Sequence, residues 1–228
     1  MNLGRVNAAF GLFSAEIFIS LWFLAAFFAP EWNLGELSLS DLGVIGTVGG
    51  EICFNMACSC GGLFGVMFGI YVTSKSVRER ILGAMIIVAC FGLAGIGIIN
   101  LNYGSLHYIT ATTYSVFSVI CVIISIVLDH KHGDLDFAIL SSILLGFCTI
   151  AVVSQPFVVY EPVAVSCQCF WIAGQSIKYM RKEDKVFDGP IKLPFRAGTP
   201  GPFRPFYLQG GRWRYHVQHR GPSFQRSA

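Results

Sequence analysis

Six long apolar stretches, separated by short polar segments, make up the first 180 residues of the chain. They lie near 6–29, 51–73, 81–102, 107–128, 135–155 and 160–179. Each is long enough to cross a hydrocarbon core of about 30 Å as a helix, which takes roughly 20 residues. The pattern therefore predicts an all-α membrane protein, with residues 1–180 forming a bundle of six transmembrane helices.

The charged residues divide between the two ends of this predicted bundle. One end carries all the Lys and Arg of the connecting segments, at residues 5, 75–80, 131 and 178–182. The opposite end carries acidic residues and no Lys or Arg: Glu31, Glu36, Asp41, Glu51 and Glu161. Because cytoplasmic loops carry the excess of Lys and Arg, we expect a plasma-membrane protein with both termini in the cytoplasm.

Residues 181–228 differ in composition from the apolar part of the chain. They contain six prolines and six glycines, with Arg and aromatic residues between them and no acid after Asp188. Such a segment cannot bury a core, so we expect a basic cytoplasmic tail that is disordered or loosely attached to the membrane surface. The net charge of +3 reflects this tail. Membrane lipids are therefore the expected partners, and nucleic acid is not indicated.

Three glycines on the second stretch, Gly61, Gly65 and Gly69, repeat at four-residue spacing. A ridge without side chains lets another helix backbone approach closely, which is how membrane helices associate. We expect this ridge to pack a neighbouring helix, either within the chain or in a homo-oligomer or membrane complex.

Glu16 lies near the middle of the first stretch, far from either end. An ionisable group is costly inside a membrane, so we expect it to face the interior of the bundle. Candidate partners are Ser59, Gln168 and Gln175. Glu16 is then either a neutral carboxyl hydrogen-bonded between helices, or the proton-handling group of a small carrier or channel.

Several polar residues gather at the predicted outer end of the bundle. Glu51 and Asn55 share a helix face, Asn102 ends the third stretch, and His107 opens the fourth. The loop 30–50 folds over this end and contains Asp41, within a run at 37–43 that predicts a short amphipathic turn. The candidate ligand-binding residues are therefore Asp41, Glu51, Asn55, Asn102 and His107.

These residues fit three different roles. They could anchor the loop, bind a lipid headgroup or small ligand, or form part of a hydrolase or lipid-modifying enzyme. In the enzyme, His107 beside Asp41 would be the general-base pair. The chain has no HExxH, paired CxxC, P-loop or GxSxG motif, so we expect no metal or cofactor, and no catalytic residue is defined.

Short motifs in the same region resemble a known family. They are Leu39-Ser40-Asp41-Leu42-Gly43, Phe54-Asn55, Gly61-Gly62-Leu63-Phe64-Gly65 and Asn102-Tyr103-Gly104-Ser105-Leu106-His107-Tyr108. Over residues 1–180 they resemble the prokaryotic family catalogued as domain of unknown function 998, although Ile-Ile-Asn replaces the Phe-Pro that often precedes the His. The layout is more distantly similar to the eukaryotic Frag1/DRAM/Sfk1 group of six-helix membrane proteins, some of which are linked to lipid handling. The resemblance implies an uncharacterised six-helix membrane protein and no particular activity.

Overall fold

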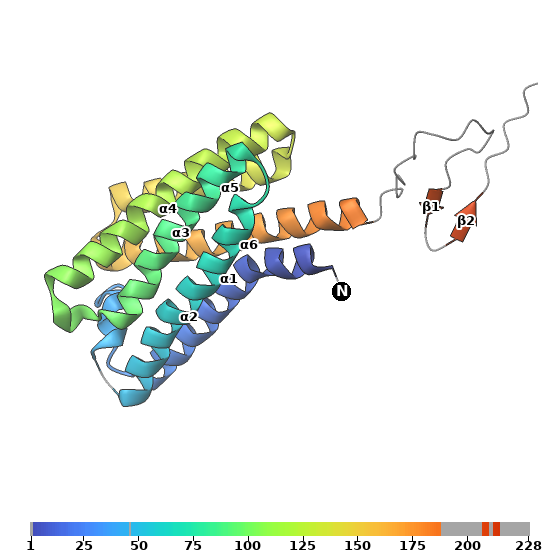
Figure 1. The fold of residues 1–228 in the computed structure, drawn as a ribbon. Helices are drawn as coiled ribbons and strands as arrows, with labels where there is room; N and C mark the ends of the chain where they lie inside the picture. The colour runs from blue at the N-terminus through green and yellow to red at the C-terminus, as the bar shows by residue number, and fades with distance from the viewer. Residues whose placement is uncertain (1, 46, 188–206, 210–211, 215–228) are drawn as a thin grey trace, which may run out of the picture.

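The computed structural model describes residues 2–45, 47–187, 207–209 and 212–214. Its six long helices are α1 (Leu3–Phe28), α2 (Val48–Thr73), α3 (Val77–Ile98), α4 (Ser105–His132), α5 (Leu135–Ser154) and α6 (Phe157–Phe187). Two short 3-10 helices lie in loops, η1 (Leu39–Gly43) and η2 (Leu101–Tyr103). Two short strands, β1 (Tyr207–Gln209) and β2 (Arg212–Arg214), pair antiparallel. Figure 1 shows the long helices packed side by side as one bundle.

All six long helices are long and apolar enough to cross a membrane. This confirms the predicted all-α membrane architecture. The largest difference lies at the C-terminal end of α6, which continues to Phe187, past the boundary predicted at 180. Charged residues of α6 pair there with other helices, as Arg5 does with Asp184 at 3.2 Å. The disorder predicted for the rest of the tail falls mainly on residues outside those described.

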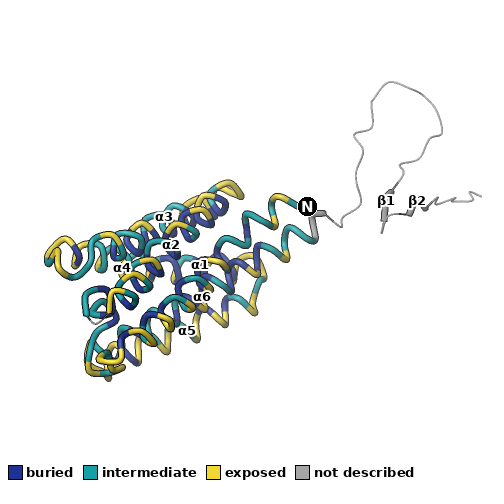
Figure 2. The backbone as a smooth tube through the Cα atoms, turned by 90° about the horizontal axis from the view of Figure 1, so that it is seen from below, coloured by how far each residue is buried: buried dark blue, intermediate teal, exposed yellow. Residues whose placement is uncertain are grey.

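The helices form a closed ring in which each packs against its neighbours in the chain and α1 packs against α6. Figure 2 shows the buried positions on the inward sides of the helices and the exposed positions on their outward sides. In Figure 1 the first turns of α1 and the last turns of α6 lie side by side, where Asn2 Nδ2 donates a hydrogen bond to the Glu183 carbonyl. The ring encloses the interior in which the candidate site lies.

Close helix packing in this ring depends on glycine. A Cβ added at Gly62 would lie 2.5 Å from the backbone nitrogen of Ala94, so α2 and α3 can approach this closely only without a side chain there. The predicted ridge of Gly61, Gly65 and Gly69 is buried against α1 and α3 of the same chain. An oligomer stays a prediction, and it requires a surface other than this ridge.

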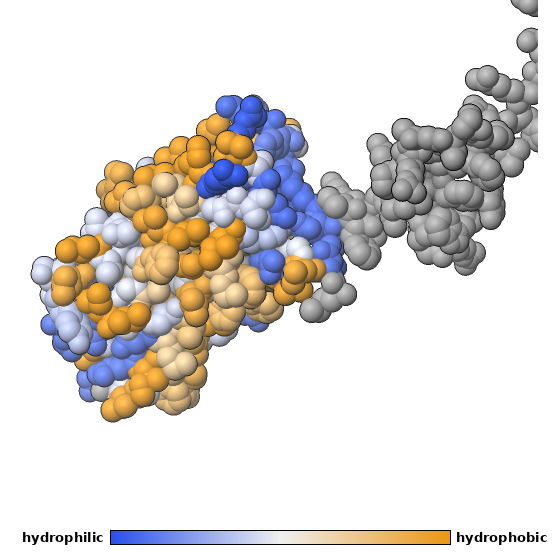
Figure 3. Space-filling model, viewed as in Figure 1, coloured by the Kyte–Doolittle hydropathy of each residue, from blue (hydrophilic) through white to orange (hydrophobic). Residues whose placement is uncertain are grey.

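The two ends of the bundle differ as the charge pattern predicts. We call the end formed by residues 29–45, 47, 99–104 and 155–161 the loop end. The opposite end, formed by residues 74–80, 129–136 and 178–184, is called the basic end. Figure 3 shows hydrophobic residues over the side of the bundle and hydrophilic residues gathered toward its ends. That the basic end faces the cytoplasm stays a prediction.

Candidate functional site

The loop 30–50 closes over the loop end through η1, the short turn that the sequence predicts. The Ser38 backbone N–H and hydroxyl both donate to Asp41 Oδ2, at 2.7 and 2.8 Å. The apolar side of the turn, Leu39 and Leu42, is buried in the core. The carboxylate of Asp41 is therefore used inside the loop, where it fixes the turn as a capping box.

His107 is buried (3% exposed) at the start of α4 and joins three segments. Its Nδ1 lies 2.7 Å from the Ile99 carbonyl oxygen, and its Nε2 lies 3.1 Å from Ser40 Oγ. Because a carbonyl can only accept, Nδ1 donates, and a neutral ring then accepts the Ser40 hydroxyl proton at Nε2. The predicted pairing of His107 with Asp41 is thus replaced by a pairing with Ser40.

The other predicted ligand-binding residues are also occupied elsewhere or turned outward. Asn55 Nδ2 donates to the Gly43 carbonyl at 3.3 Å and so fastens η1 to α2. Asn102 is exposed and Glu51 is half-buried, and neither side chain forms a hydrogen bond within the described part of the chain. Asp41, Asn55 and His107 thus fit the predicted role of anchoring the loop. The loop that they hold closes over the loop end of the bundle.

A cavity of about 310 Å³ lies directly beneath η1, inside the ring. Most of its wall is apolar and comes from Phe18, Phe54, Leu93, Ile96 and Val165. None of the five predicted ligand-binding residues lines it. Its volume is at the lower end of the range for small-molecule sites, about 300–1,000 Å³. The cavity can therefore hold a small, mainly apolar molecule.

The polar end of this cavity is formed by Ser40 and Glu161. Glu161 Oε2 accepts a hydrogen bond of 2.8 Å from the Leu39 backbone N–H, which ties α6 to η1. Ser40 lines the same cavity as Glu161. Ser40 therefore links the cavity to His107, which accepts its hydroxyl proton at Nε2.

One face of α6 supplies a continuous stripe of the cavity wall. Its residues are Glu161, Ala164, Val165 and Gln168, at the spacing of positions on one face of a helix. Gln168 Oε1 is buried, and no hydrogen-bond partner for it is found among the described residues. The signal for this stripe in the sequence is an acid and an amide seven residues apart. The sequence pattern predicts Glu161 only as an acid of the outer end and Gln168 as a candidate partner of Glu16, so it does not connect the two.

The cavity opens sideways between α4 and α5. Four of its lining residues are exposed on the outer surface of the bundle: Ser115 and Val119 of α4, Val152 of α5 and Phe157 of α6. In a membrane-spanning bundle this surface faces lipid. A molecule can therefore reach the cavity from within the bilayer.

A second cavity, of about 30 Å³, continues deeper into the bundle. It shares Tyr114, Ser118 and Gln168 with the larger cavity and extends to Trp171. A space of this size is sufficient for one water molecule, which needs roughly 10–15 Å³ and polar partners. The interior thus becomes narrower with distance from Ser40.

The sequence profile of the family described as "Protein of unknown function (DUF998)" matches residues 13–176. The chain belongs to this family. The match includes Ser40, His107 and Glu161, and it begins in α1 and ends in α6. No curated protein and no solved structure matches the chain. The family description carries no activity, so the function of this DUF998 protein has to be inferred from the geometry of its site.

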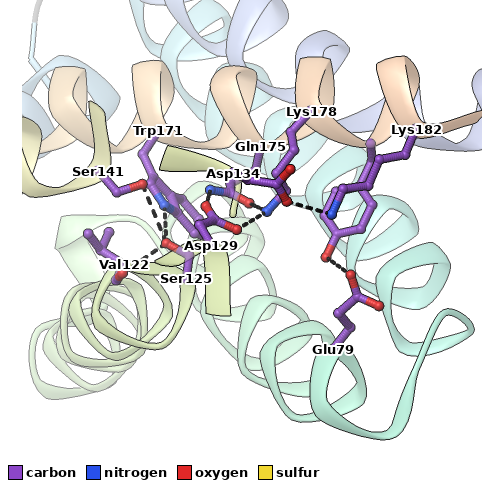
Figure 4. Close-up of polar contacts among 11 residues, drawn as sticks. Glu79, Val122, Ser125, Asp129, Asp134, Ser141, Trp171, Gln175, Lys178 and Lys182 are labelled. Carbon is purple, nitrogen blue, oxygen red and sulfur yellow. Dashed lines mark hydrogen bonds and ion pairs between the residues drawn. The ribbon is translucent and has the colours of Figure 1, made fainter. Parts of the chain in front are cut away.

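At the basic end of the DUF998 protein, a second polar cluster joins α4 to α6 (Figure 4). Lys178 Nζ lies 2.6 Å from Asp129 Oδ1, and Gln175 Nε2 donates to Asp129 Oδ2 at 2.9 Å. One turn away along both helices, Trp171 Nε1 donates to Ser125 Oγ at 2.9 Å. Because these groups satisfy one another, we assign the cluster to holding α6 against α4.

Sequence reasoning missed this cluster because both charges lie at the ends of predicted helices. Asp129 followed directly after the stretch predicted to end at 128, and Lys178 was counted with the basic residues that set the orientation. A signal was present in the spacing, since Ser125 and Asp129, like Trp171 and Gln175, are four residues apart and share a helix face.

Glu16 does not face the interior of the DUF998 bundle, and the prediction that it does is wrong. The core side of α1 at this level is formed by Ser14, Ala15 and Phe18, and the Ser14 hydroxyl donates to the Gly61 carbonyl at 2.7 Å. Glu16 lies on the exposed side of the helix. A proton path through the bundle therefore cannot be built on Glu16, and the carrier hypothesis loses its basis.

Proposed function

We propose that this DUF998 protein binds one amphiphilic molecule taken from the bilayer, with its polar end at Ser40 and Glu161. The observation that carries the proposal is a largely apolar cavity with a polar end and a lateral opening. The proposal keeps the predicted binding of a lipid headgroup or small ligand at the loop end. It places the contacts with the ligand at Ser40 and Glu161 instead of at Asp41, Asn55 and His107. The sequence layout also resembles the Frag1/DRAM/Sfk1 group. Some members of that group are linked to lipid handling, which is consistent with the proposal.

The polar end must supply the selectivity of such a site. Lipid tails are as apolar as leucine side chains, so moving an alkyl chain from the bilayer into an apolar cavity gains little hydrophobic free energy. Hydrogen bonds and charge at Ser40 and Glu161 can discriminate between molecules, because the buried wall around them contains few competing polar groups. His107 is a positioning residue in this scheme, since it holds Ser40 over the cavity.

The proposal is tested by native mass spectrometry of the full chain, purified with its co-purifying lipids. The wild type is compared with Ala164→Phe, which fills the cavity from α6, and with Ile150→Phe, which adds the same ring on the exposed surface of α5. We expect an adduct on the wild type and on Ile150→Phe, and its loss from Ala164→Phe. An adduct that is present on all three proteins, or on none, would contradict the proposal.

The bond between Ser40 and His107 favours one second candidate, a serine hydrolase or acyltransferase that acts on a lipid ester. Ser40 Oγ would attack the ester carbonyl while His107 Nε2 accepts the hydroxyl proton, and the acyl–oxygen bond would then break as His107 returns that proton to the departing alcohol. The carboxyl group of Glu161 beside Ser40 argues against this reaction, because it would repel the oxyanion that forms. Labelling of Ser40 by a fluorophosphonate, absent from Ser40→Ala, would favour the enzyme over the binding protein.

A further inference from the structure

We infer that the molecule in the cavity carries a protonated amine as its polar end, and that Glu161 recognises it. The inference rests on the proposed function and names the class of ligand: a cationic amphiphile with one alkyl chain. A cavity of about 310 Å³ is small for a ligand site. It accommodates one alkyl chain.

The acidic character of the loop end favours a cationic ligand. Four carboxylic acids, Glu31, Glu36, Asp41 and Glu161, lie at this end with His107 beside them, and the described residues of the end include no Lys or Arg. Glu161 takes part in none of the ion pairs of the described chain, all of which lie at the basic end, such as those of Lys178 and Lys182. An ionised Glu161 therefore has no ion-pair partner among the described residues, and a cationic ligand would supply one.

Glu161 also has acceptor sites left for a hydrogen-bond donor. The carboxyl group of Glu161 receives the Leu39 N–H, whereas an ionised carboxylate offers about four acceptor sites. The single hydroxyl proton of Ser40 is donated to His107 Nε2. An ammonium group brings three donors and no acceptor, so it supplies what the site lacks.

A third observation lies deeper on the same face of α6. Gln168 Oε1 is a buried acceptor without a donor among the described residues, and it lines the same cavity. It lies seven residues after Glu161, a rise of about 10 Å along the helix. Both polar residues of the α6 stripe thus have acceptor capacity left, and a water molecule or a hydroxyl group of the ligand can donate to Gln168.

The same features disfavour the other common headgroups. A carboxylate or phosphate would place a second negative charge against Glu161 with no basic residue to offset it, and like charges in a low-dielectric site repel strongly. An alcohol can donate one hydrogen bond but brings no countercharge. Charge-assisted hydrogen bonds are roughly twice as strong as neutral ones, so the amine is the preferred headgroup.

The test compares three probes with the same alkyl chain: dodecylamine, dodecanol and dodecanoate. Binding to the full chain in lipid nanodiscs is measured at pH 7, where the amine is protonated. The variants are Glu161→Gln, which removes the charge and keeps the shape, Glu31→Gln, which removes an exposed acid at the same end, and Ala164→Phe, which fills the cavity. Size-exclusion chromatography and circular dichroism verify that each variant is folded.

We expect the wild type and Glu31→Gln to bind dodecylamine at least tenfold more tightly than the other two probes, as a charged hydrogen bond implies. Glu161→Gln should bind the amine no more tightly than dodecanol. If all three probes bind equally and only Ala164→Phe abolishes binding, the amine inference fails while the proposed function stands. If Ala164→Phe binds the probes as the wild type does, the cavity is not the site and both fail.

Discussion

Lys178 on α6 and Asp129 on α4 form a buried ion pair, with Nζ 2.6 Å from Oδ1 and exposures of only 3% and 1%. Gln175 donates to the second carboxylate oxygen at 2.9 Å and also accepts from the same ammonium group. Removing one partner of such a pair leaves an uncompensated buried charge, which costs about 3–5 kcal/mol in protein interiors.

We therefore expect Lys178→Met to lower the free energy of unfolding by about 3–5 kcal/mol. The matched control is Lys182→Met, which removes a pair with Asp134 whose side chains are 37% and 25% exposed and which should cost about 0–1 kcal/mol. Unfolding in mixed detergent micelles measures both. The double variant Asp129→Leu/Lys178→Met should recover part of the loss. Equal effects of Lys178→Met and Lys182→Met would show that the pair is accessible to water.

His107→Ala should loosen the loop without unfolding the bundle. The substitution removes the bonds to Ser40 and Ile99 and leaves the half-buried Ile99 carbonyl without that donor, at a cost of about 1–3 kcal/mol. Hydrogen exchange should become faster at residues 38–45 and remain unchanged in α2. His130→Ala, which changes an exposed histidine, serves as the control. Unchanged exchange at 38–45 would mean that the capping box of Asp41 and Ser38 holds the loop alone.

The short distance between α2 and α3 predicts a sharp contrast between two glycines. A methyl group at Gly62 would meet backbone atoms, the Ala94 nitrogen at 2.5 Å and the Cys90 carbonyl oxygen at 2.7 Å, which cannot move as a side chain does. Gly62→Ala should therefore destabilise the bundle by about 1–3 kcal/mol or more. Gly146→Ala in α5, where a Cβ meets nothing within 4 Å, should be neutral or stabilising by up to about 1 kcal/mol. Thermal unfolding in detergent measures both.

The sequence was sufficient to predict the six helices because apolar length alone decides whether a segment can span a membrane. It could not predict which side of α1 faces the core. In a soluble helix the apolar stripe marks the buried side, but in a membrane both the lipid and the interior accept apolar residues. The free-energy cost of an ionisable group in lipid predicted that Glu16 faces the interior of the bundle, whereas the packing of Ser14 against Gly61 turns it outward.

The sequence placed the candidate ligand-binding residues at the loop end, but it did not predict which contacts these residues make. The spacing of Ser38 and Asp41 matches the capping-box pattern, which would have shown that Asp41 is used within the turn. That His107 then meets Ser40 depends on how η1 is placed against the starts of α4 and α6. Such a contact joins residues far apart in the sequence, so no local pattern predicts it.

The exposed carboxyl of Glu16 gives the last prediction. It lies at the middle of α1, on the side that faces lipid in the monomer. An acidic side chain at the centre of a membrane helix costs about 2.5–3.5 kcal/mol on insertion scales. Glu16→Leu should therefore raise the thermal stability of the protein in lipid nanodiscs and leave binding of dodecylamine unchanged.

The matched control for this variant is Ser20→Leu, which changes a polar residue one turn further along the same exposed side of α1. It removes no carboxyl and should have a smaller effect. If Glu16→Leu instead lowers the stability or changes the mass of the complex in native mass spectrometry, a second protein surface covers Glu16 in the membrane. That surface would then be where the predicted oligomer or membrane complex forms, since the ridge of Gly61, Gly65 and Gly69 is filled within the chain.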